Sequence, residues 1–289
     1  MTGQRLLGKV AWITGGARGQ GRAIAVKFAS EGADIVVSDV CAQLENVPYP
    51  MSDDSDMLET KRLVEASGRR CLTKVADVRS QAALDDVVAA ALDQFGQIDV
   101  VCANHGIASW HPVWEITDEE WEMQLAVNLT GVWHVVKAAI PHMIERRSGS
   151  LILTSSTNGR IAYPNMAHYT AAKHGVLGLM KSVALELGPH NVRANALLTG
   201  PIHTPMADNP ATLKGLFGRD DATTADYVNA TRHFFALRGR AALPPSAVAD
   251  ALLWLASDEA ANVSGLELVL DAGHSILPPY NPNPIVDEG

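Results

Sequence analysis

Short apolar runs alternate with longer amphipathic stretches along almost the whole of this 289-residue chain. Runs such as VVCA and LILT are apolar at every position, which is expected of strands that helices cover on both faces. This alternation is typical of βαβ units and a parallel sheet. We predict strands at about 9–14, 34–39, 71–76, 98–103, 150–155, 191–197 and 266–270.

Capping residues mark the helices between these strands. The helix after Gly21 ends at Gly32, because glycine readily adopts the left-handed conformation that closes a helix. Thr117 and Glu120 form a capping box in front of a long helix. Another helix spans about 166–187. The predicted fold is α/β: a single Rossmann-type, doubly wound parallel sheet of about seven strands with helices on both faces.

Composition indicates a folded domain that has no nucleic-acid partner. Hydrophobic residues make up 47% of the chain and charged residues 19%, the balance of a globular protein. The net charge of −9 would repel nucleic acid or an anionic membrane surface. We therefore expect one dinucleotide-binding and catalytic domain at residues 1–276, followed by a proline-rich tail at 277–289.

The cysteines and the amino-terminal segment indicate a cytoplasmic protein. Cys41, Cys71 and Cys102 are far apart and odd in number, which suits a reducing compartment better than a set of disulfides. No apolar stretch of signal-peptide length precedes the first glycine cluster. No later run is long enough to cross a bilayer, so we expect no membrane partner.

Two segments depart from the regular alternation. An insertion at about 41–60 is rich in Pro and Asp and longer than a crossover needs, so part of it is expected to be a surface loop. The segment at about 200–240 mixes Pro, Gly and Asp with aromatic residues such as Phe217. Because a long loop of this kind beside a ligand site commonly covers the substrate, we predict a substrate lid there.

A glycine-rich turn follows the first predicted strand. It contains Gly15, Gly19 and Gly21 and leads directly into a helix. Glycine allows the backbone to turn sharply and to approach a pyrophosphate, and the helix N-terminus supplies free N–H groups. Many glycine-rich turns are only tight loops, but this one opens a βαβ unit, which favours dinucleotide binding.

Asp39 ends the second predicted strand, 24 residues after Gly15. A carboxylate there can accept hydrogen bonds from ribose hydroxyls; the alternative is a solvated aspartate at a strand end. Arg18 could hold the 2′-phosphate of NADP. A carboxylate about 4 Å from that phosphate would oppose it by about 4 kcal/mol at an effective dielectric of about 20, roughly a thousandfold in affinity. We therefore expect NAD.

Ser156, Tyr169 and Lys173 form a candidate proton-transfer centre. Ser156 closes the fifth predicted strand, and Lys173 lies four residues after Tyr169, on the same face of one helix. A free tyrosine is only about 0.1% ionised at neutral pH, and a nearby lysine cation, helped by a positive nicotinamide ring, would lower its pKa. The phenolate would then act as general base while the serine hydroxyl holds the substrate oxygen. Singly, each of these residue types is more often a packing or surface residue.

Together these residues resemble the short-chain dehydrogenase/reductase family over about 7–276. The family's T-G-x-x-x-G-x-G turn begins at Thr14, and its Y-x-x-x-K motif runs from Tyr169 to Lys173. The resemblance implies that Arg18 and Gln20 of the turn also bind the cofactor. It further implies that Asn128 bends a helix and continues a proton relay from the lysine, and that Asp77-Val78 lies at the adenine. Without the resemblance, Asp77 would be interpreted as a surface aspartate and Asn128 as a buried polar residue.

Two motifs depart from the family pattern. The family's N-N-A-G stretch is Ala103-Asn104-His105-Gly106 here; Asn104 and Gly106 match, and His105 replaces a small residue. A histidine there could reach the cofactor ribose or the active site, although a packed, neutral imidazole is the favoured interpretation. The family's P-G pair is Thr199-Gly200, so the contacts to the nicotinamide carboxamide are expected from the backbone of Ile202 and the hydroxyl of Thr204.

The insertion narrows the resemblance. The stretches DVCAQ, VPYP and DMLETKRLVEASGRR resemble the carveol-dehydrogenase-like, mycofactocin-coupled subgroup of actinobacteria. This resemblance implies that the insertion covers NAD and retains it without exchange, so that reducing equivalents leave through a redox partner such as mycofactocin. The alternative is a surface loop without a role in cofactor exchange. Relatives pair through the helices that carry Asn128 and Tyr169, which implies a homotetramer or a dimer.

The residues expected around the substrate are largely apolar, and no arginine cluster indicates a phosphate or an acyl carrier. Those assigned to the pocket are Trp110, Ile161, Tyr163 and Met206. We therefore predict NAD-dependent, reversible oxidation of a secondary, apolar or alicyclic alcohol of the carveol type to the ketone, although such a set of residues is as often ordinary core.

Two other functions fit parts of the pattern. A biosynthetic ketoreductase would use NADPH, which Asp39 disfavours. A non-catalytic NAD-binding sensor would lose the catalytic tyrosine or lysine, and both are present. We expect no metal, because no H-E-x-x-H pair or Cys/His cluster occurs, and no serine hydrolase, because Ser156 lacks a G-x-S-x-G elbow.

Overall fold

Within residues 4–277, which the computed structural model describes, seven parallel strands form one sheet, and all seven predicted strands are confirmed. Their ends differ from the predicted ones by at most two residues. The order is β3-β2-β1-β4-β5-β6-β7, so the chain winds outward from β1 on one side and from β4 on the other. The strands are β1 (Val10–Thr14), β2 (Asp34–Asp39), β3 (Cys71–Val75), β4 (Val100–Ala103), β5 (Gly149–Thr154), β6 (Val192–Thr199) and β7 (Glu267–Leu270).

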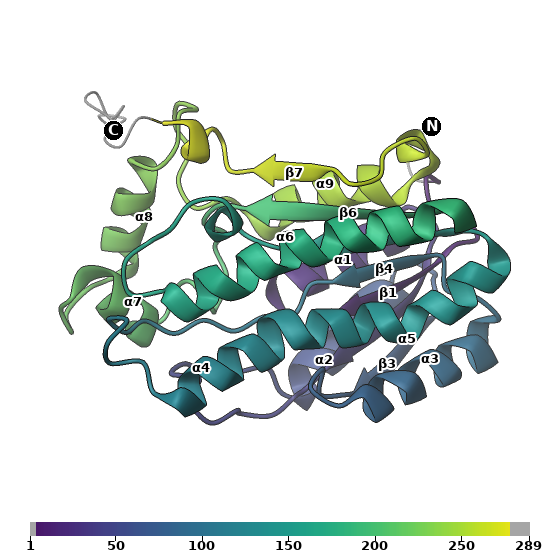
Figure 1. Ribbon diagram of the computed structural model, residues 1–289, viewed down its shortest axis with the longest axis horizontal. Helices are drawn as coiled ribbons and strands as arrows, with labels where there is room; N and C mark the ends of the chain where they lie inside the picture. The colour runs from purple at the N-terminus through teal and green to yellow at the C-terminus, as the bar shows by residue number, and fades with distance from the viewer. Residues whose placement is uncertain (1–3, 278–289) are drawn as a thin grey trace.

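Helices cover both faces of the sheet (Figure 1). On one face α1, α2 and α9 pack around Phe28 and Ile24, and on the other α3, α5 and α6 pack around Leu84 and Met143. The strands are apolar on both sides for this reason. The helices are α1 (Gly19–Ser30), α2 (Asp54–Glu65), α3 (Gln81–Phe95), α4 (Asp118–Leu125), α5 (Gly131–Arg146), α6 (Ala167–Leu187), α7 (Pro210–Phe217), α8 (Thr224–Arg232) and α9 (Pro245–Ala256).

The long helix predicted after Thr117 is interrupted. The capping box of Thr117 and Glu120 is present, but α4 ends at Leu125 and a π-helical turn, Ala126–Thr130, joins it to α5. A π turn adds a residue to the helical repeat and displaces the side chains around it. Asn128 lies in this turn, and its amide makes two hydrogen bonds to the backbone of the loop after β4. The sequence spacing predicted the helix but not the widened turn.

The insertion consists of a loop, as expected for part of it, followed by a helix. Its helical half is α2, and Asp53 caps that helix by accepting from the N–H of Asp56. In the preceding loop Leu44, Val47 and Tyr49 are buried. They pack against residues that follow β4 and lie on the π turn. The insertion therefore crosses the carboxyl edge of the sheet from β2 towards β4.

The segment predicted as a lid contains α7 and α8, which lie beyond the carboxyl ends of the strands, at the left in Figure 1. Across residues 4–277 no helix has both the length and the apolar composition of a membrane span. The proline-rich tail predicted at 277–289 lies outside the described residues except for Leu277.

Candidate active site

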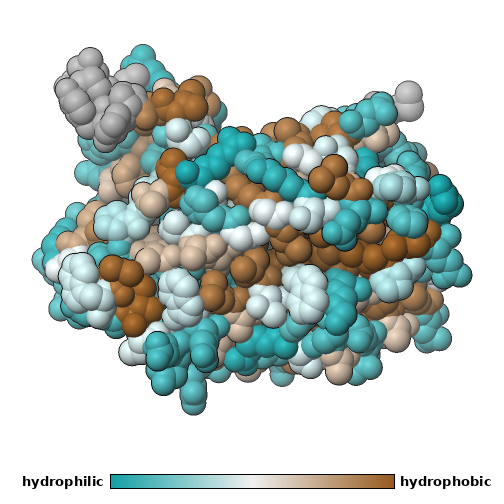
Figure 2. Space-filling model, in the orientation of Figure 1, coloured by the Kyte–Doolittle hydropathy of each residue, from teal (hydrophilic) through white to brown (hydrophobic). Residues whose placement is uncertain are grey.

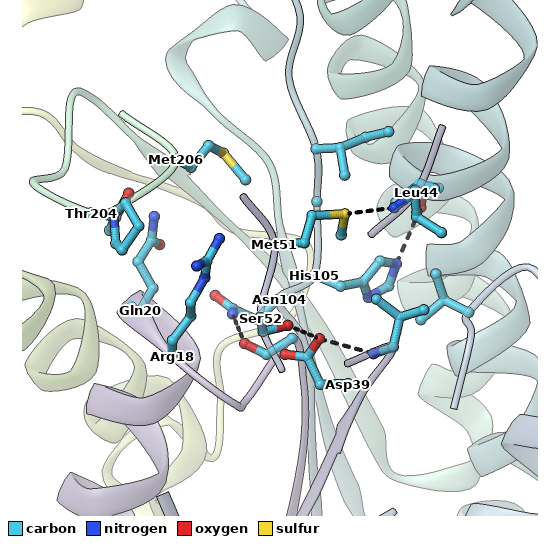
Figure 3. A pocket seen from close by; sticks show the side chains of 18 of the residues that line it. Arg18, Gln20, Asp39, Leu44, Met51, Ser52, Asn104, His105, Thr204 and Met206 are labelled. Atoms are coloured by element: carbon cyan, nitrogen blue, oxygen red, sulfur yellow. Dashed lines mark hydrogen bonds between the residues drawn. The ribbon is translucent and has the colours of Figure 1, made fainter. Parts of the chain in front are cut away.

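A cleft opens at the carboxyl edge of the sheet, where β1 and β4 are neighbours and the winding changes direction. Parallel sheets bind their ligands at this kind of switch point. Its lining comes from the glycine turn, the ends of β2 and β3, the loop after β4, the insertion and the lid (Figure 3). Segments that are distant in sequence therefore meet around one cleft.

The glycine turn has the geometry expected of a pyrophosphate site. Gly15 and Gly19 have φ angles of 63° and 58°, in the left-handed region that favours glycine. A Cβ atom on Gly21 would lie 2.0 Å from the carbonyl oxygen of Gly15, so no larger residue fits there. No side chain caps the N-terminus of α1, where Arg18 is the capping residue. Its free N–H groups are available to an anion.

Asp39 and Arg18 join the glycine turn to the insertion. The Asp39 carboxylate accepts hydrogen bonds from the N–H groups of Ala17 and Val40, at 3.0 and 2.8 Å. The Ser52 hydroxyl donates to the same carboxylate at 2.8 Å. The Arg18 guanidinium donates to the carbonyl of Pro50 at 2.5 Å and does not stand free beside Asp39. Asp39 and Arg18 both line the cleft, and the Arg18 guanidinium is tied to the insertion by its bond to Pro50.

Unpaired polar atoms around the cleft fit a ligand that carries hydroxyl or amide groups. Among residues 4–277, the Oδ1 atom of Asn104 and the Oε1 atom of Gln20 are buried and accept no hydrogen bond. Both residues line the cleft. A buried acceptor without a partner is unfavourable, so its retention here indicates that a bound molecule supplies the donor. The ribose hydroxyls and carboxamide of a dinucleotide are donors of this kind.

Asp77 and Val78 lie at the far end of the cleft, after β3. The Asp77 carboxylate pairs with the Arg79 guanidinium at 2.5 Å. Burial alone would raise the pKa of Asp77, but the hydrogen bonds from Arg79 hold that pKa below its ordinary value. Gly131 at the start of α5 allows close packing, because a Cβ atom there would lie 2.7 Å from a methyl group of Val78.

Ser156, Tyr169 and Lys173 are brought together beside this cleft. Ser156 follows β5, and its hydroxyl donates to the side-chain oxygen of Asn158 at 3.3 Å. Tyr169 lies in the first turn of α6, and the Lys173 Nζ atom is 5.6 Å from the centre of its ring. Lys173 Nζ also donates to the carbonyl of Thr154 at 2.9 Å. The two helical residues therefore share one face, as their spacing predicts.

Burial controls the acidity of this pair. It raises the pKa of Tyr169 to about 12, and a hydrogen bond with Ser156 offsets only part of this effect. Burial lowers the pKa of Lys173 to about 8. The sequence led us to expect that the lysine would lower the tyrosine pKa. In the protein alone, desolvation is the dominant effect on the pKa of Tyr169, because a buried phenolate loses its hydration.

Asn128 fixes the loop that follows β4. Its Oδ1 atom accepts from the N–H of Ile107 at 3.0 Å, and its Nδ2 atom donates to the Ile107 carbonyl at 2.9 Å. Gly106 passes between Asn128 and Lys173: a Cβ atom there would lie 2.9 Å from Asn128 Oδ1 and 3.7 Å from Lys173 Nζ. A glycine is therefore needed at this position, and Asn128 holds the loop close to the lysine.

His105 is a packed, neutral imidazole, which was the favoured interpretation. Its Nδ1 atom is 2.6 Å from the Thr14 hydroxyl, and its Nε2 atom is 3.2 Å from the carbonyl of Val127. Burial lowers the pKa of His105 to about 3, so the ring carries no charge at neutral pH. It links β1, β4 and the π turn beneath the cleft.

Thr204 and Ile202 have different positions at the start of the lid. Thr204 lines the cleft above Gly19, as expected of a cofactor contact. The Ile202 side chain is buried and does not line the cleft. The Ile202 backbone forms an isolated β-bridge with Leu243. That pairing uses the carbonyl of Pro201 and the N–H of His203, and so leaves the N–H of Ile202 out of the bridge. The expected backbone contact from Ile202 stays a prediction.

The predicted substrate residues fall into two groups. Met206 lines the cleft and packs with Trp110 in one apolar cluster. Ile161 is only half-buried, and the Tyr163 hydroxyl is engaged with the Nε2 atom of His274. Tyr163 therefore joins the loop after β5 to the carboxyl-terminal segment and does not present its hydroxyl to the cleft.

Several residues in the insertion or next to it line the cleft, although the sequence did not assign them to it. They are Val40, Leu44, Tyr49, Met51 and Ser52. A tyrosine between two prolines in an acidic loop was the signal that could have identified this contact. Among residues 4–277 no group of three or more His, Cys, Asp or Glu side chains is placed to hold a metal ion.

Comparisons with known proteins agree with this geometry. A family model described as enoyl-(acyl carrier protein) reductase matches residues 15–275. The chain is 41% identical to (−)-trans-carveol dehydrogenase of Rhodococcus erythropolis, over 94% of this chain and 99% of that protein. The crystal structure of carveol dehydrogenase from Mycobacterium avium in complex with NAD matches with a TM-score of 0.92 and 42% identity, over 95% of this chain and all of that one. An NAD-bound short-chain dehydrogenase from Mycobacterium paratuberculosis matches with a TM-score of 0.87 and 38% identity, over 94% and 100%.

Proposed function

Since the chain belongs to the short-chain dehydrogenase/reductase family, we propose that it oxidises a secondary, apolar alicyclic alcohol of the carveol type to the ketone, reversibly and with NAD. It is an NAD-dependent oxidoreductase. The observation that carries the proposal is the grouping of Ser156, Tyr169 and Lys173 beside a dinucleotide cleft. The phenol there would accept the hydroxyl proton of an alcohol, and a dinucleotide held in the cleft would supply the hydride acceptor.

The lining of the cleft supports an assignment of the residues that would hold NAD. Asp39 and Asn104 would bind ribose hydroxyls, the N-terminus of α1 would bind the pyrophosphate, and Thr204 would contact the nicotinamide part. When bound there, NAD⁺ supplies the hydride acceptor and a positive charge beside the phenol. The carboxylate of Asp39, together with the engagement of Arg18 by Pro50, supports NAD over NADP.

Tyr169 is the general base of this proposal. The Ser156 hydroxyl binds the substrate oxygen, and the Tyr169 phenolate accepts the hydroxyl proton. The Lys173 ammonium stabilises the phenolate by its charge, and its hydrogen bond to Thr154 keeps it in place. Asn128 acts through the loop at Gly106, which it holds beside that ammonium. In the reverse direction, the phenol returns the proton to the alkoxide oxygen.

Apolar side chains support an apolar alcohol as substrate. Ile107, Val127 and Met206 line the cleft next to the loop that Asn128 holds. The lid at 200–240 contributes Met206, and its helix α7 packs on Trp110. The carveol dehydrogenase relatives, at 41% and 42% identity, support a cyclic terpenoid alcohol or a similar ring compound.

We also propose that the insertion retains NAD between turnovers. Three contacts support this: Ser52 bonds Asp39, Arg18 bonds Pro50, and the Tyr49 hydroxyl accepts from the N–H of Ala108 at 3.1 Å. The insertion is thereby attached on both sides of the cleft. Reducing equivalents would then leave through a redox partner such as mycofactocin, and not as free NADH.

An apolar surface supports a homotetramer or a dimer. Hydrophobic residues form a band across the face on which α5 and α6 lie (Figure 2). Trp133 of α5 is 43% exposed and Leu185 of α6 is 80% exposed. Large exposed apolar side chains of this kind favour burial against another copy of the chain. Cytoplasmic location stays part of the proposal.

Two measurements on the purified protein test the function. The nucleotide bound to one sample is extracted and identified, and another sample is assayed on a panel of alcohols. We expect bound NAD and oxidation of alicyclic secondary alcohols. A clear preference for NADPH and ketone reduction would favour a biosynthetic ketoreductase instead. Bound NAD with no turnover of any alcohol, by bound or added cofactor and with an artificial electron acceptor present, would favour a non-catalytic sensor.

A further inference from the structure

The insertion forms an apolar wall beside the reaction centre as well as a cover over the dinucleotide. Its buried residues pack with residues of the loop after β4, the π turn and the lid. We call this cluster the insertion wall; it consists of Leu44, Val47, Tyr49, Ile107 and Val127, with Trp110 and Met206 packed against it. Nearly all of its side chains are purely apolar, so each polar atom in it needs an explanation.

The first such atom is the hydroxyl of Tyr49. It accepts a hydrogen bond from the N–H of Ala108 at 3.1 Å. A phenol can also donate one hydrogen bond, and among residues 4–277 no acceptor receives it. Tyr49 is buried and lines the cleft, so this donor is not simply solvated. Its hydrogen is therefore available to a molecule in the cleft.

The second atom is the indole nitrogen of Trp110. Among residues 4–277 its Nε1 atom is buried and has no hydrogen-bond partner. Helix α7 of the lid packs closely against the Trp110 side chain. A Cβ atom on Gly215 of α7 would lie 2.5 Å from the Trp110 Cβ atom and 2.7 Å from its Cγ atom. A phenylalanine would fill most of this space without an unpaired donor. Trp110 does not line the cleft, however, so the donor of the insertion wall that faces the cleft is the Tyr49 hydroxyl.

The insertion wall is close to the reacting atoms. Ala108, which contacts Tyr49, lies two residues after Gly106, the residue that passes between Asn128 and Lys173. Burial raises the pKa of Tyr49, and the negative charge of an ionised Tyr169 raises it further. Tyr49 is therefore a neutral phenol that keeps its proton while Tyr169 works as the base, which suits a hydrogen-bond donor and not a second base.

We propose that the Tyr49 hydroxyl forms a subsite that binds a second oxygen of the substrate. This inference rests on the proposed function and makes it more specific. The preferred substrate is an alicyclic alcohol with a further acceptor, such as a ring carbonyl, an ether oxygen or a second hydroxyl, at a distance from the carbinol that is oxidised. Tyr49 determines specificity and does not take part in proton transfer.

The test compares two ring alcohols of the same shape. 3-Hydroxycyclohexanone and 4-hydroxycyclohexanone carry the second oxygen, and 3- and 4-methylcyclohexanol carry a methyl group in its place. We measure kcat/KM with NAD, and we measure binding to the NAD-containing protein by calorimetry, which needs no turnover. We expect Tyr49→Phe to reduce the preference for the hydroxyketones about tenfold, as loss of one neutral hydrogen bond does.

The matched control removes a buried hydroxyl elsewhere. Tyr227 of α8 is buried in the lid and does not line the cleft. Tyr227→Phe should leave the ratio between hydroxyketone and methylcyclohexanol unchanged, even if it alters the stability of the lid. This control separates a specific hydrogen bond from a general loss of packing.

An unchanged ratio between the two alcohol classes in Tyr49→Phe would overturn the subsite. The ratio is unchanged if kcat/KM falls for both classes by the same factor, if neither value changes, or if only NAD binding is weakened. In the last case the hydroxyl serves the dinucleotide. Failure of the proposed function is distinct: the wild-type protein would then oxidise neither class, while the calorimetric comparison still tests whether the hydroxyketones bind through Tyr49.

Discussion

The Nζ atom of Lys173 lies 5.6 Å from the centre of the Tyr169 ring, one helical turn away. At this distance the ammonium charge acts on the phenol without a direct hydrogen bond. Burial of the pair raises the pKa of Tyr169 and lowers that of Lys173. The protein alone therefore holds a neutral phenol at neutral pH. Its ionisation is favoured only when another positive charge enters the cleft.

Replacing Tyr169 with phenylalanine should remove most of the activity. General-base catalysis contributes about 100- to 10,000-fold, and no other buried base contacts Ser156 among the described residues. We expect kcat to fall within this range while the protein still binds NAD, as measured by calorimetry. Tyr163→Phe is the matched control, since that hydroxyl is engaged with His274. Activity near the wild-type level in Tyr169→Phe would refute the assignment of the base.

The stability of the protein should depend on pH through Lys173. Its folded-state pKa of about 8 lies below the ordinary value of 10.5, so the unfolded chain binds the proton more tightly. The free energy of unfolding therefore rises with pH between about 8 and 10.5, by about 3 kcal/mol at most, and this contribution is absent below pH 8. Lys173→Met should lack this rise.

The measurement is the free energy of unfolding of wild type minus that of Lys173→Met, at several pH values from 7 to about 10.5. Taking the difference cancels the buried cysteines, whose raised pKa values act in the opposite direction in both proteins. We expect the difference to increase with pH. A difference that is flat or decreases would mean that Lys173 is not desolvated in the folded protein.

The sequence could predict those parts of the site that depend on local spacing. Gly15 and Asp39 lie at the ends of neighbouring strands, and an alternating apolar pattern places strand ends at one edge of the sheet. Tyr169 and Lys173 are four residues apart in a helix, which fixes their common face. In each case the periodicity of a strand or a helix determines which residues lie together, so these residues can be identified directly from their spacing in the sequence.

Features that depend on packing between distant segments could not be predicted in this way. Tyr49 reaches Ala108 across 59 residues, and no local pattern encodes that contact. The π turn at Asn128 results from hydrogen bonds to the loop after β4, and the helix propensity of the AVNLT segment does not reveal it. The raised pKa of Tyr169 likewise follows from burial, which only the assembled fold determines.

Asp39→Asn should weaken the discrimination against NADP. The asparagine keeps the shape of the side chain but removes the charge that opposes a 2′-phosphate. That opposition is worth about 4 kcal/mol at an effective dielectric of about 20, so the preference for NAD should fall by up to roughly a thousandfold. The readout is the ratio of kcat/KM for NAD and NADP. Ser52→Ala, which removes a hydrogen bond to Asp39 but keeps its charge, should change that ratio far less.

Arg18→Ala should accelerate the release of NAD. The Arg18 guanidinium bonds the Pro50 carbonyl and so attaches the insertion to the glycine turn. Loss of one charge-assisted hydrogen bond corresponds to about a tenfold increase in the dissociation rate. The rate is measured by displacing bound NAD with an isotopically labelled excess. Arg62→Ala, which removes an exposed pair with Glu59 on α2, is the matched control and should leave the rate unchanged. If Arg18→Ala and wild type release NAD equally fast, the attachment at Pro50 does not retain the cofactor.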